Sequence, residues 1–126
     1  MVSGLTLDAG ALIAFERNDR RAVALVARSL VHGHALAVPA GVVAQVWRDG
    51  RRQSRLARLL AAGEVEIVAL DDYRAREAGQ LCGAMGTSDV VDASVVLCAR
   101  TRRHRIVTSD SDDLRRLDSD AVLIAI

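Results

Sequence analysis

Short apolar runs alternate with longer runs of helical character along this sequence, and this alternation limits the folds that the chain can adopt. The apolar runs predict strands at residues 5–7, 35–38, 65–70, 105–108 and 121–126. The intervening runs predict helices at residues 9–17, 20–31, 40–47, 53–62, 72–84, 89–99 and 112–117. Most strands are apolar at consecutive positions, as in a parallel sheet that helices cover on both faces. The sequence therefore predicts an α/β fold of three layers, α/β/α, around a mostly parallel sheet of about five strands.

The composition agrees with one folded domain spanning residues 1–126. Hydrophobic residues make up 51% of the chain and the mean hydropathy is +0.19, which excludes a disordered chain. The apolar stretches are too short to cross a bilayer, and Asp8 interrupts the early apolar run before the first basic residue, Arg17, so no membrane span or secretion signal is expected. Cys82 and Cys98 have apolar neighbours, which is typical of reduced core thiols in a cytoplasmic protein.

Two acids open the apolar helix predicted at residues 89–99. Asp89 and Asp92 are three positions apart, so they share one face of that helix. The rest of the helix is apolar on nearly all sides, which predicts a central, buried position. Carboxylates at the first turn of a buried helix need a cap, a cation or a metal ion.

Two further acids follow predicted strands. Asp8 comes directly after the first strand and Asp110 comes after the fourth. If these strands are neighbours, both acids meet Asp89 and Asp92 in one crevice at the carboxyl ends of the strands. Carboxylates at such short range raise one another's pKa, and Mg²⁺ or Mn²⁺ relieves the repulsion through oxygen ligands. This arrangement points to metal-dependent hydrolysis of phosphodiesters.

Helix capping explains each of these acids equally well when it is taken alone. An Asp at a helix start accepts hydrogen bonds from free backbone N–H groups and interacts favourably with the helix dipole. This alternative applies to Asp8, Asp89, Asp92, Asp110, Asp112 and Asp113. The three histidines, His32, His34 and His104, lie near strand beginnings and are expected at the surface, so a nucleophilic triad is not predicted.

Four segments resemble the PIN domain family, and specifically the VapC-type ribonuclease toxins of bacterial toxin–antitoxin pairs. They are residues 7–12, the helix after Pro39, residues 89–93 and residues 107–114, and together the resemblance covers essentially the whole chain. It implies that Asp8, Asp92 and Asp110 hold Mg²⁺ or Mn²⁺, with Asp89 as an additional catalytic acid. The family usually has Glu on the helix after the second strand, but position 45 is Gln here.

The resemblance also implies partners. These are an RNA substrate, a cognate antitoxin seated in apolar grooves beside the first helices, and a second copy of the chain in a homodimer. All seventeen basic residues are Arg, and those at 48, 51 and 52 (Arg48, Arg51, Arg52) would flank the acids and contact the RNA backbone. The alternative is that these arginines only cover solvated helix faces.

Two other functions stay open. The neutral Gln45 favours a PIN-like module that binds RNA or a partner with weakened or lost nuclease activity. A phosphatase or receiver domain would also place acids at this edge of the sheet, but both usually need a Lys, and the chain has none. The sequence favours a divalent-metal-dependent endoribonuclease, the toxin of a type II pair.

Overall fold

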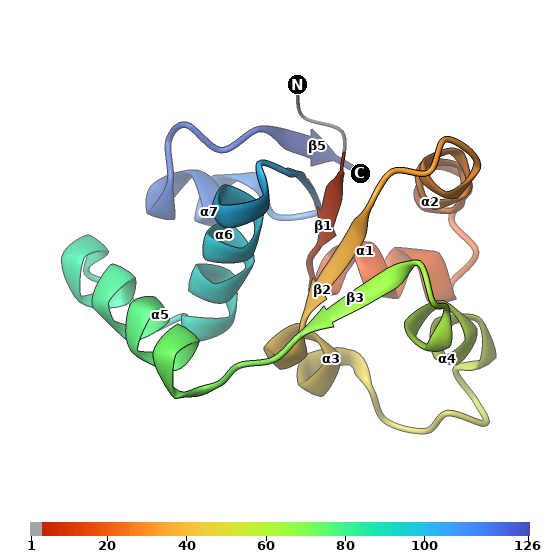
Figure 1. Cartoon of the computed structure of the whole chain (residues 1–126), viewed down its shortest axis with the longest axis horizontal. Helices are drawn as coiled ribbons and strands as arrows, with labels where there is room; N and C mark the ends of the chain where they lie inside the picture. Colours follow the sequence, from red (N-terminus) through yellow and green to blue (C-terminus); the bar gives the residue numbers. More distant parts are fainter. Residues whose placement is uncertain (1–3) are drawn as a thin grey trace.

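All five strands of the sheet run parallel in the computed structural model, which describes residues 4–126. They are β1 (Leu5–Leu7), β2 (Leu36–Pro39), β3 (Val65–Val68), β4 (Arg105–Thr108) and β5 (Leu123–Ala125), in the order β3-β2-β1-β4-β5 (Figure 1). β1 therefore lies at the centre, with β4 beside it in the register Leu7 to Val107. The predicted parallel sheet is confirmed, and so is the adjacency of the first and fourth strands.

Seven helices cover the two faces of this sheet. They are α1 (Ala9–Glu16), α2 (Arg20–Val31), α3 (Ala40–Val46), α4 (Ser54–Ala61), α5 (Asp72–Met85), α6 (Val90–Arg102) and α7 (Ser111–Leu117). Helices α1, α2 and α4 lie on one face and α5 to α7 on the other, while α3 lies at the end of β2 and contacts both α1 and α6 (Figure 1). This arrangement is the predicted three-layer α/β/α fold. The chain crosses the sheet in one direction from β1 to β3 and in the opposite direction from β3 to β5, so right-handed connections place the two groups of helices on opposite faces.

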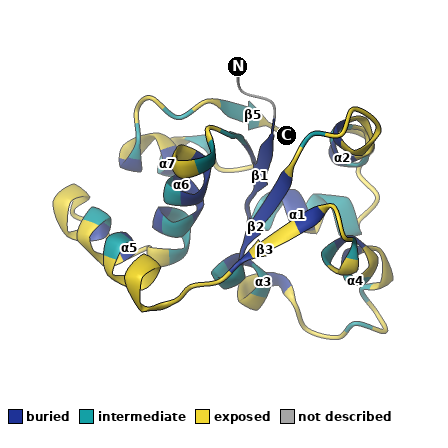
Figure 2. Ribbon diagram, viewed as in Figure 1, coloured by how far each residue is buried: buried dark blue, intermediate teal, exposed yellow. Residues whose placement is uncertain are grey.

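The central strands are buried on both faces, as their apolar sequences predict (Figure 2). Helix α6 packs against β1, β2 and β4 and buries Val95 and Val96 completely, which confirms its central position. Helix α5 packs on α6 and α7 instead of on the sheet, and most of its residues are exposed. None of the helices in residues 4–126 is long and apolar enough to cross a membrane by itself; α5 and α6 pass that test only as a pair bent by 109°.

Both edge strands are shorter than the sequence predicts. The strand expected at residues 65–70 ends at Val68, and the strand expected at 121–126 covers only Leu123–Ala125. Each edge strand pairs with one neighbour, and those neighbours, β2 and β4, are four residues long. An edge strand cannot extend its hydrogen-bond ladder past its partner.

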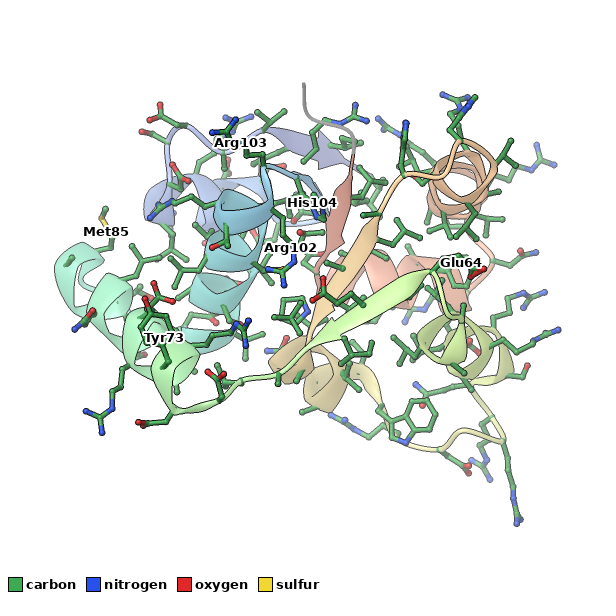
Figure 3. All side chains as sticks on the ribbon, in the orientation of Figure 1. Glu64, Tyr73, Met85, Arg102, Arg103 and His104 are labelled. Atoms are coloured by element: carbon green, nitrogen blue, oxygen red, sulfur yellow. The ribbon has the colours of Figure 1, made fainter. Side chains whose placement is uncertain are left out.

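Two side-chain contacts connect the end of α6, and the residues just after it, to the sheet. Arg102 extends from α6 toward β3 (Figure 3), where its Nε and Nη2 donate to the Glu66 carboxylate at 3.0 and 2.9 Å. His104 is half-buried and its Nδ1 lies 3.1 Å from the Thr6 hydroxyl, so its prediction as a surface residue is wrong. The ring fits there because residue 4 is Gly; a Cβ at this position would overlap the ring. Cys82 and Cys98 are buried and free, as predicted.

Candidate functional site

The carboxyl ends of β1 and β4 bring two of the predicted acids to the same edge of the sheet. Asp8 directly follows β1, and its backbone N–H donates to the Val107 carbonyl of β4 at 3.3 Å. Asp110 follows β4, and its N–H donates to the Thr108 hydroxyl at 2.8 Å, which fixes the turn after the strand. Strand pairing therefore juxtaposes two acids that are about a hundred positions apart in the sequence.

Asp8 is both a helix cap and a buried acid. Its Oδ1 accepts a hydrogen bond from the Ala11 N–H at 2.9 Å, so the predicted capping role is confirmed. The residue is only 6% exposed, and burial raises the pKa of its carboxyl. Hydrogen bonding to Thr108 and to the backbone at Ala11 opposes this shift. A cap alone does not require burial, because exposed Asp19 and Asp71 make the same bond to α2 and α5.

Asp89 and Asp92 stand together at the start of α6. Asp89 caps the helix, since its Oδ1 accepts from the Asp92 N–H at 3.0 Å. Burial, followed by the negative charge of Asp89 and a hydrogen bond with it, raises the pKa of Asp92 from 3.8 to about 7. The charges of Asp110 and Asp113 add to this shift.

Asp110 links Asp8 to Asp92 electrostatically, because the charge of Asp8 acts on Asp110 and that of Asp110 acts on Asp92. A hydrogen bond with Asp113 raises the pKa of Asp110 most, followed by partial desolvation and by the charges of Asp113 and Asp8. Asp110 occupies the N-cap position of α7, but its side chain makes no capping hydrogen bond there. The Asp113 backbone N–H, three positions on, nevertheless opposes the rise in the pKa of Asp110, so the capping role is weaker for this acid than for Asp8 and Asp89.

A cavity of about 340 Å³ opens beside α6 and α7 at this edge of the sheet. It is lined by Met85, Gly86, Thr87, Asp89, Asp92, Asp113, Arg116 and Leu117. Asp8 and Asp110 are outside this lining; the charge of Asp110 acts on Asp92 in the lining, and the charge of Asp8 acts on Asp110. Asp113 and Arg116 were not among the predicted site residues. Their spacing from Asp110 could have indicated them, because residues three positions apart share a helix face.

The donor set suits a hard divalent cation. It consists of carboxylates, which Mg²⁺ and Mn²⁺ prefer. Burial raises the pKa of Asp8 and Asp92, and neighbouring carboxylates raise the pKa of Asp92 and Asp110 further, a repulsion that a cation would relieve. Within residues 4–126, however, no three His, Cys, Asp or Glu side chains are already grouped as metal ligands. The acids match a metal in chemistry, and their side chains need to turn toward a common point to bind it.

Gln45 lies on the side of α3 that faces α6. A Cβ on Gly41, one helical turn earlier, would lie 3.5 Å from Val91 Cγ2 and 4.0 Å from Ser94 Oγ. Residues four apart share a helix face, so Gln45 points toward the first turns of α6. The packing of these two helices thus allows residue 45 to lie near the start of α6, and the Gln45 side chain is exposed.

The three arginines predicted to contact RNA lie at the connection between α3 and α4. Arg48 Nη1 donates to the carbonyl oxygens of Ala44 and Trp47, at 3.1 and 2.7 Å. Arg52 Nε lies 3.9 Å from Asp49 Oδ2 and its side chain is largely exposed, as is Arg51. None of the three lines the cavity that contains Asp89 and Asp92, and their contact with RNA stays a prediction.

Comparisons with known proteins agree with this fold. A sequence profile of the PIN domain matches residues 5–120. VapBC2 from Rickettsia felis, solved bound to a DNA fragment from its promoter, is similar with a TM-score of 0.72 at 14% identity, covering 99% of this chain and 98% of that chain. FitAcB from Neisseria gonorrhoeae has a TM-score of 0.63 at 16% identity, covering 95% of this chain and 96% of that chain. No curated protein matches in sequence.

The two kinds of comparison carry different weight. At these identities the structural similarities concern the fold alone. The profile, in contrast, matches the sequence itself from β1 to the segment after α7, and so includes all four predicted acids. The resemblance to the PIN domain family that the sequence motifs indicated is confirmed by this match. The chain belongs to the PIN domain family.

Proposed function

We propose that this chain is a divalent-metal-dependent endoribonuclease and the toxin of a type II toxin–antitoxin pair. The observation that carries the proposal is the electrostatic linkage of Asp8, Asp92 and Asp110, which come from β1, α6 and β4. The charge of Asp110 raises the pKa of Asp92, and the charge of Asp8 raises that of Asp110. Negative charge concentrated at one edge of the sheet lowers the stability of the fold, and a bound cation would offset this loss.

In this proposal Asp8, Asp92 and Asp110 hold Mg²⁺ or Mn²⁺, and Asp89 is a further acid beside them. An ion bound there would supply an activated water and would neutralise charge on the phosphodiester. The chain's own residues position this chemistry. The Thr108 hydroxyl holds the backbone at Asp110, and the Ala11 N–H holds one oxygen of Asp8. The Asp89 carboxylate holds the start of α6 and thereby the backbone of Asp92.

The proposal of an antitoxin partner rests on a groove and on the similar structures. The groove, about 240 Å³ in volume, lies between α1, α3 and α4 and is lined by Leu12, Ile13, Glu16, Arg17, Val46, Gln53 and Leu56. Ile13 is 41% exposed there, so an apolar segment of a partner would bury it. Among the similar structures, VapBC2 was solved bound to a DNA fragment from its promoter, and FitAB was solved bound to the DNA fragment IR36. Homodimerisation stays a prediction.

Removing the charge of Asp8 tests the proposed function. With Mg²⁺ or Mn²⁺, we expect the wild-type protein to cleave members of a panel of cellular RNAs, and Asp8→Asn to reduce cleavage by a hundredfold or more. Asp19→Asn is the matched control, because Asp19 caps α2 with the same geometry and is not part of the acid site. Cleavage that survives in Asp8→Asn, or that does not need a divalent ion, would contradict the proposal.

A binding module without nuclease activity is the alternative, and Gln45 is the residue that favours it. Gln45→Glu adds a charge on the side of α3 that faces α6, so we expect the Mg²⁺ concentration for half-maximal cleavage to fall about tenfold. Gln80→Glu, an exposed change on α5, controls for net charge. Cleavage that appears only in Gln45→Glu would favour the binding module. Identical metal dependence in all three proteins would contradict a place for residue 45 in the metal site.

A further inference from the structure

One basic side chain, that of Arg116, lines the cavity that contains Asp89 and Asp92. Of the described residues that line it, Arg116 is the only basic one, and it shares the lining with Asp89 and Asp92. Its Nη1 donates to Asp113 Oδ1 at 3.1 Å. The Arg116 side chain is 79% exposed, so the guanidinium keeps N–H groups available for another partner.

The helical spacing explains why Arg116, and not its neighbour, faces the cavity. Asp113 and Arg116 are three positions apart in α7 and share the face turned toward α6. Arg115 is exposed and does not line the cavity. Arg115 and Arg116 therefore have the same side-chain chemistry, but only Arg116 lines the cavity.

A site built from carboxylates has an electrostatic difficulty with RNA, since every phosphate carries a negative charge. Asp8, Asp89, Asp92, Asp110 and Asp113 all contribute negative charge here, and repel a phosphodiester that approaches the cavity. A guanidinium at the rim offsets this repulsion and binds phosphate oxygens through two parallel N–H donors. The ion pair with Asp113 orients the group without occupying all of its donors.

We propose that Arg116 binds the RNA phosphate at or next to the scissile bond and so positions the substrate against the acids. This inference rests on the proposed nuclease function and adds to it a residue that contacts the substrate. In the absence of RNA, Arg116 pairs with Asp113 alone. When RNA is bound, the phosphate takes the outward edge of the guanidinium.

The test compares Arg116→Ala with Arg115→Ala on a single-stranded RNA that the wild-type protein cleaves. We expect kcat/KM to fall tenfold or more in Arg116→Ala, mainly through KM, and to change less than twofold in Arg115→Ala. Arg116→Lys keeps the charge but loses the fork, so it recovers only part of the loss. The slope of log affinity against log salt concentration should decrease by about 0.7 in Arg116→Ala, the value for one lost phosphate contact on a single strand.

RNA binding in the Asp92→Asn background separates this inference from the nuclease proposal, because it needs no turnover. With a single-stranded RNA that the Asp92→Asn protein binds, whether or not the wild-type protein cleaves it, we expect Arg116→Ala to weaken binding about tenfold relative to Arg115→Ala. Equal binding and equal kcat/KM for the two alanine variants would overturn the role of Arg116 and leave the nuclease intact. Weaker binding in Arg116→Ala without any wild-type cleavage would support Arg116 and contradict the nuclease. Equal melting temperatures of the two variants exclude a folding defect.

Discussion

Asp92→Asn is expected to abolish RNA cleavage and at the same time to make the protein more stable at neutral pH. The loss of activity, a hundredfold or more, follows if Asp92 is a metal ligand, because Asn brings no charge. The gain in stability follows from the pKa of Asp92, which burial and the charge of Asp89 raise from 3.8 to about 7. Asn resembles the protonated acid, which is the form that the folded protein prefers.

The gain should depend on pH in a defined direction. The pKa of Asp92 is higher in the folded protein than in the unfolded chain, so its contribution to stability is fully present below pH 4 and is lost as the pH rises to about 7. The two proteins should therefore be equally stable near pH 4 and differ most above pH 7. Because Asp92 is only partly buried, solvent screening reduces the difference to about 1–2 kcal/mol, or about 5 °C in Tm.

Thermal unfolding of both proteins at several pH values, without divalent metal, measures this difference. Asp72→Asn is a suitable control, since Asp72 is exposed in the first turn of α5 and away from the acids. A Tm difference that does not change between pH 4 and pH 8 would contradict the raised pKa of Asp92. A stable Asp92→Asn protein that still cleaves RNA at the wild-type rate would remove Asp92 from the site.

Gly10→Ala is expected to damage both stability and activity, although Ala is the better helix former by about 1 kcal/mol. A Cβ on Gly10 would lie 2.9 Å from Ser109 Cβ and 3.3 Å from the Ser109 backbone N, and it would also contact Ser109 Oγ. The hydroxyl can rotate away, but the Cβ and the backbone cannot. Overpacking of this kind costs about 1–3 kcal/mol, and it pushes apart the segments that carry Asp8 and Asp110.

The expected result is a net loss of about 1–2 kcal/mol of stability and a tenfold or larger loss of RNA cleavage, since small displacements at a site cost much activity. Adding Ser109→Gly should restore both, with a coupling energy of about 1–3 kcal/mol in the double-mutant cycle. Gly79→Ala is the control, because no atom lies within 4 Å of its Cβ position in α5. If Gly10→Ala is as stable as Gly79→Ala, the close packing of α1 on the β4–α7 turn is not a constraint.

The sequence predicts this site in part because two kinds of pattern coincide. Consecutive apolar residues predict parallel strands, and the acids at positions 8 and 110 follow two of them directly. Only the strand order shows that these two strands are neighbours. Asp89 also illustrates how a local role and a site role coexist, since it caps α6 and raises the pKa of Asp92.

The contributions that the sequence does not predict depend on contacts between distant segments. Asp113 has an adequate local explanation in the first turn of α7, so its charge on Asp92 is recognised only when α6 and α7 are seen together. Glu16 is a similar case. Two turns beyond Asp8 it is a weak candidate for the site, and its carboxylate instead accepts the Leu56 N–H of α4 at 2.7 Å. The lengths of β3 and β5 depend on partner strands, which local propensity does not describe.

The central position of β1 has a consequence for the synthesis of the protein. The ribosome makes β1 well before its neighbour β4, which begins a hundred residues later, at Arg105. Until β4 has left the ribosome, Asp8 lacks the strand that places Asp110 beside it. The nascent chain can therefore assemble β1, β2 and β3 while the acid site is still incomplete. A nuclease built in this order would stay inactive while β1 to β3 assemble, and would acquire activity only once the segment after β4 is free to fold.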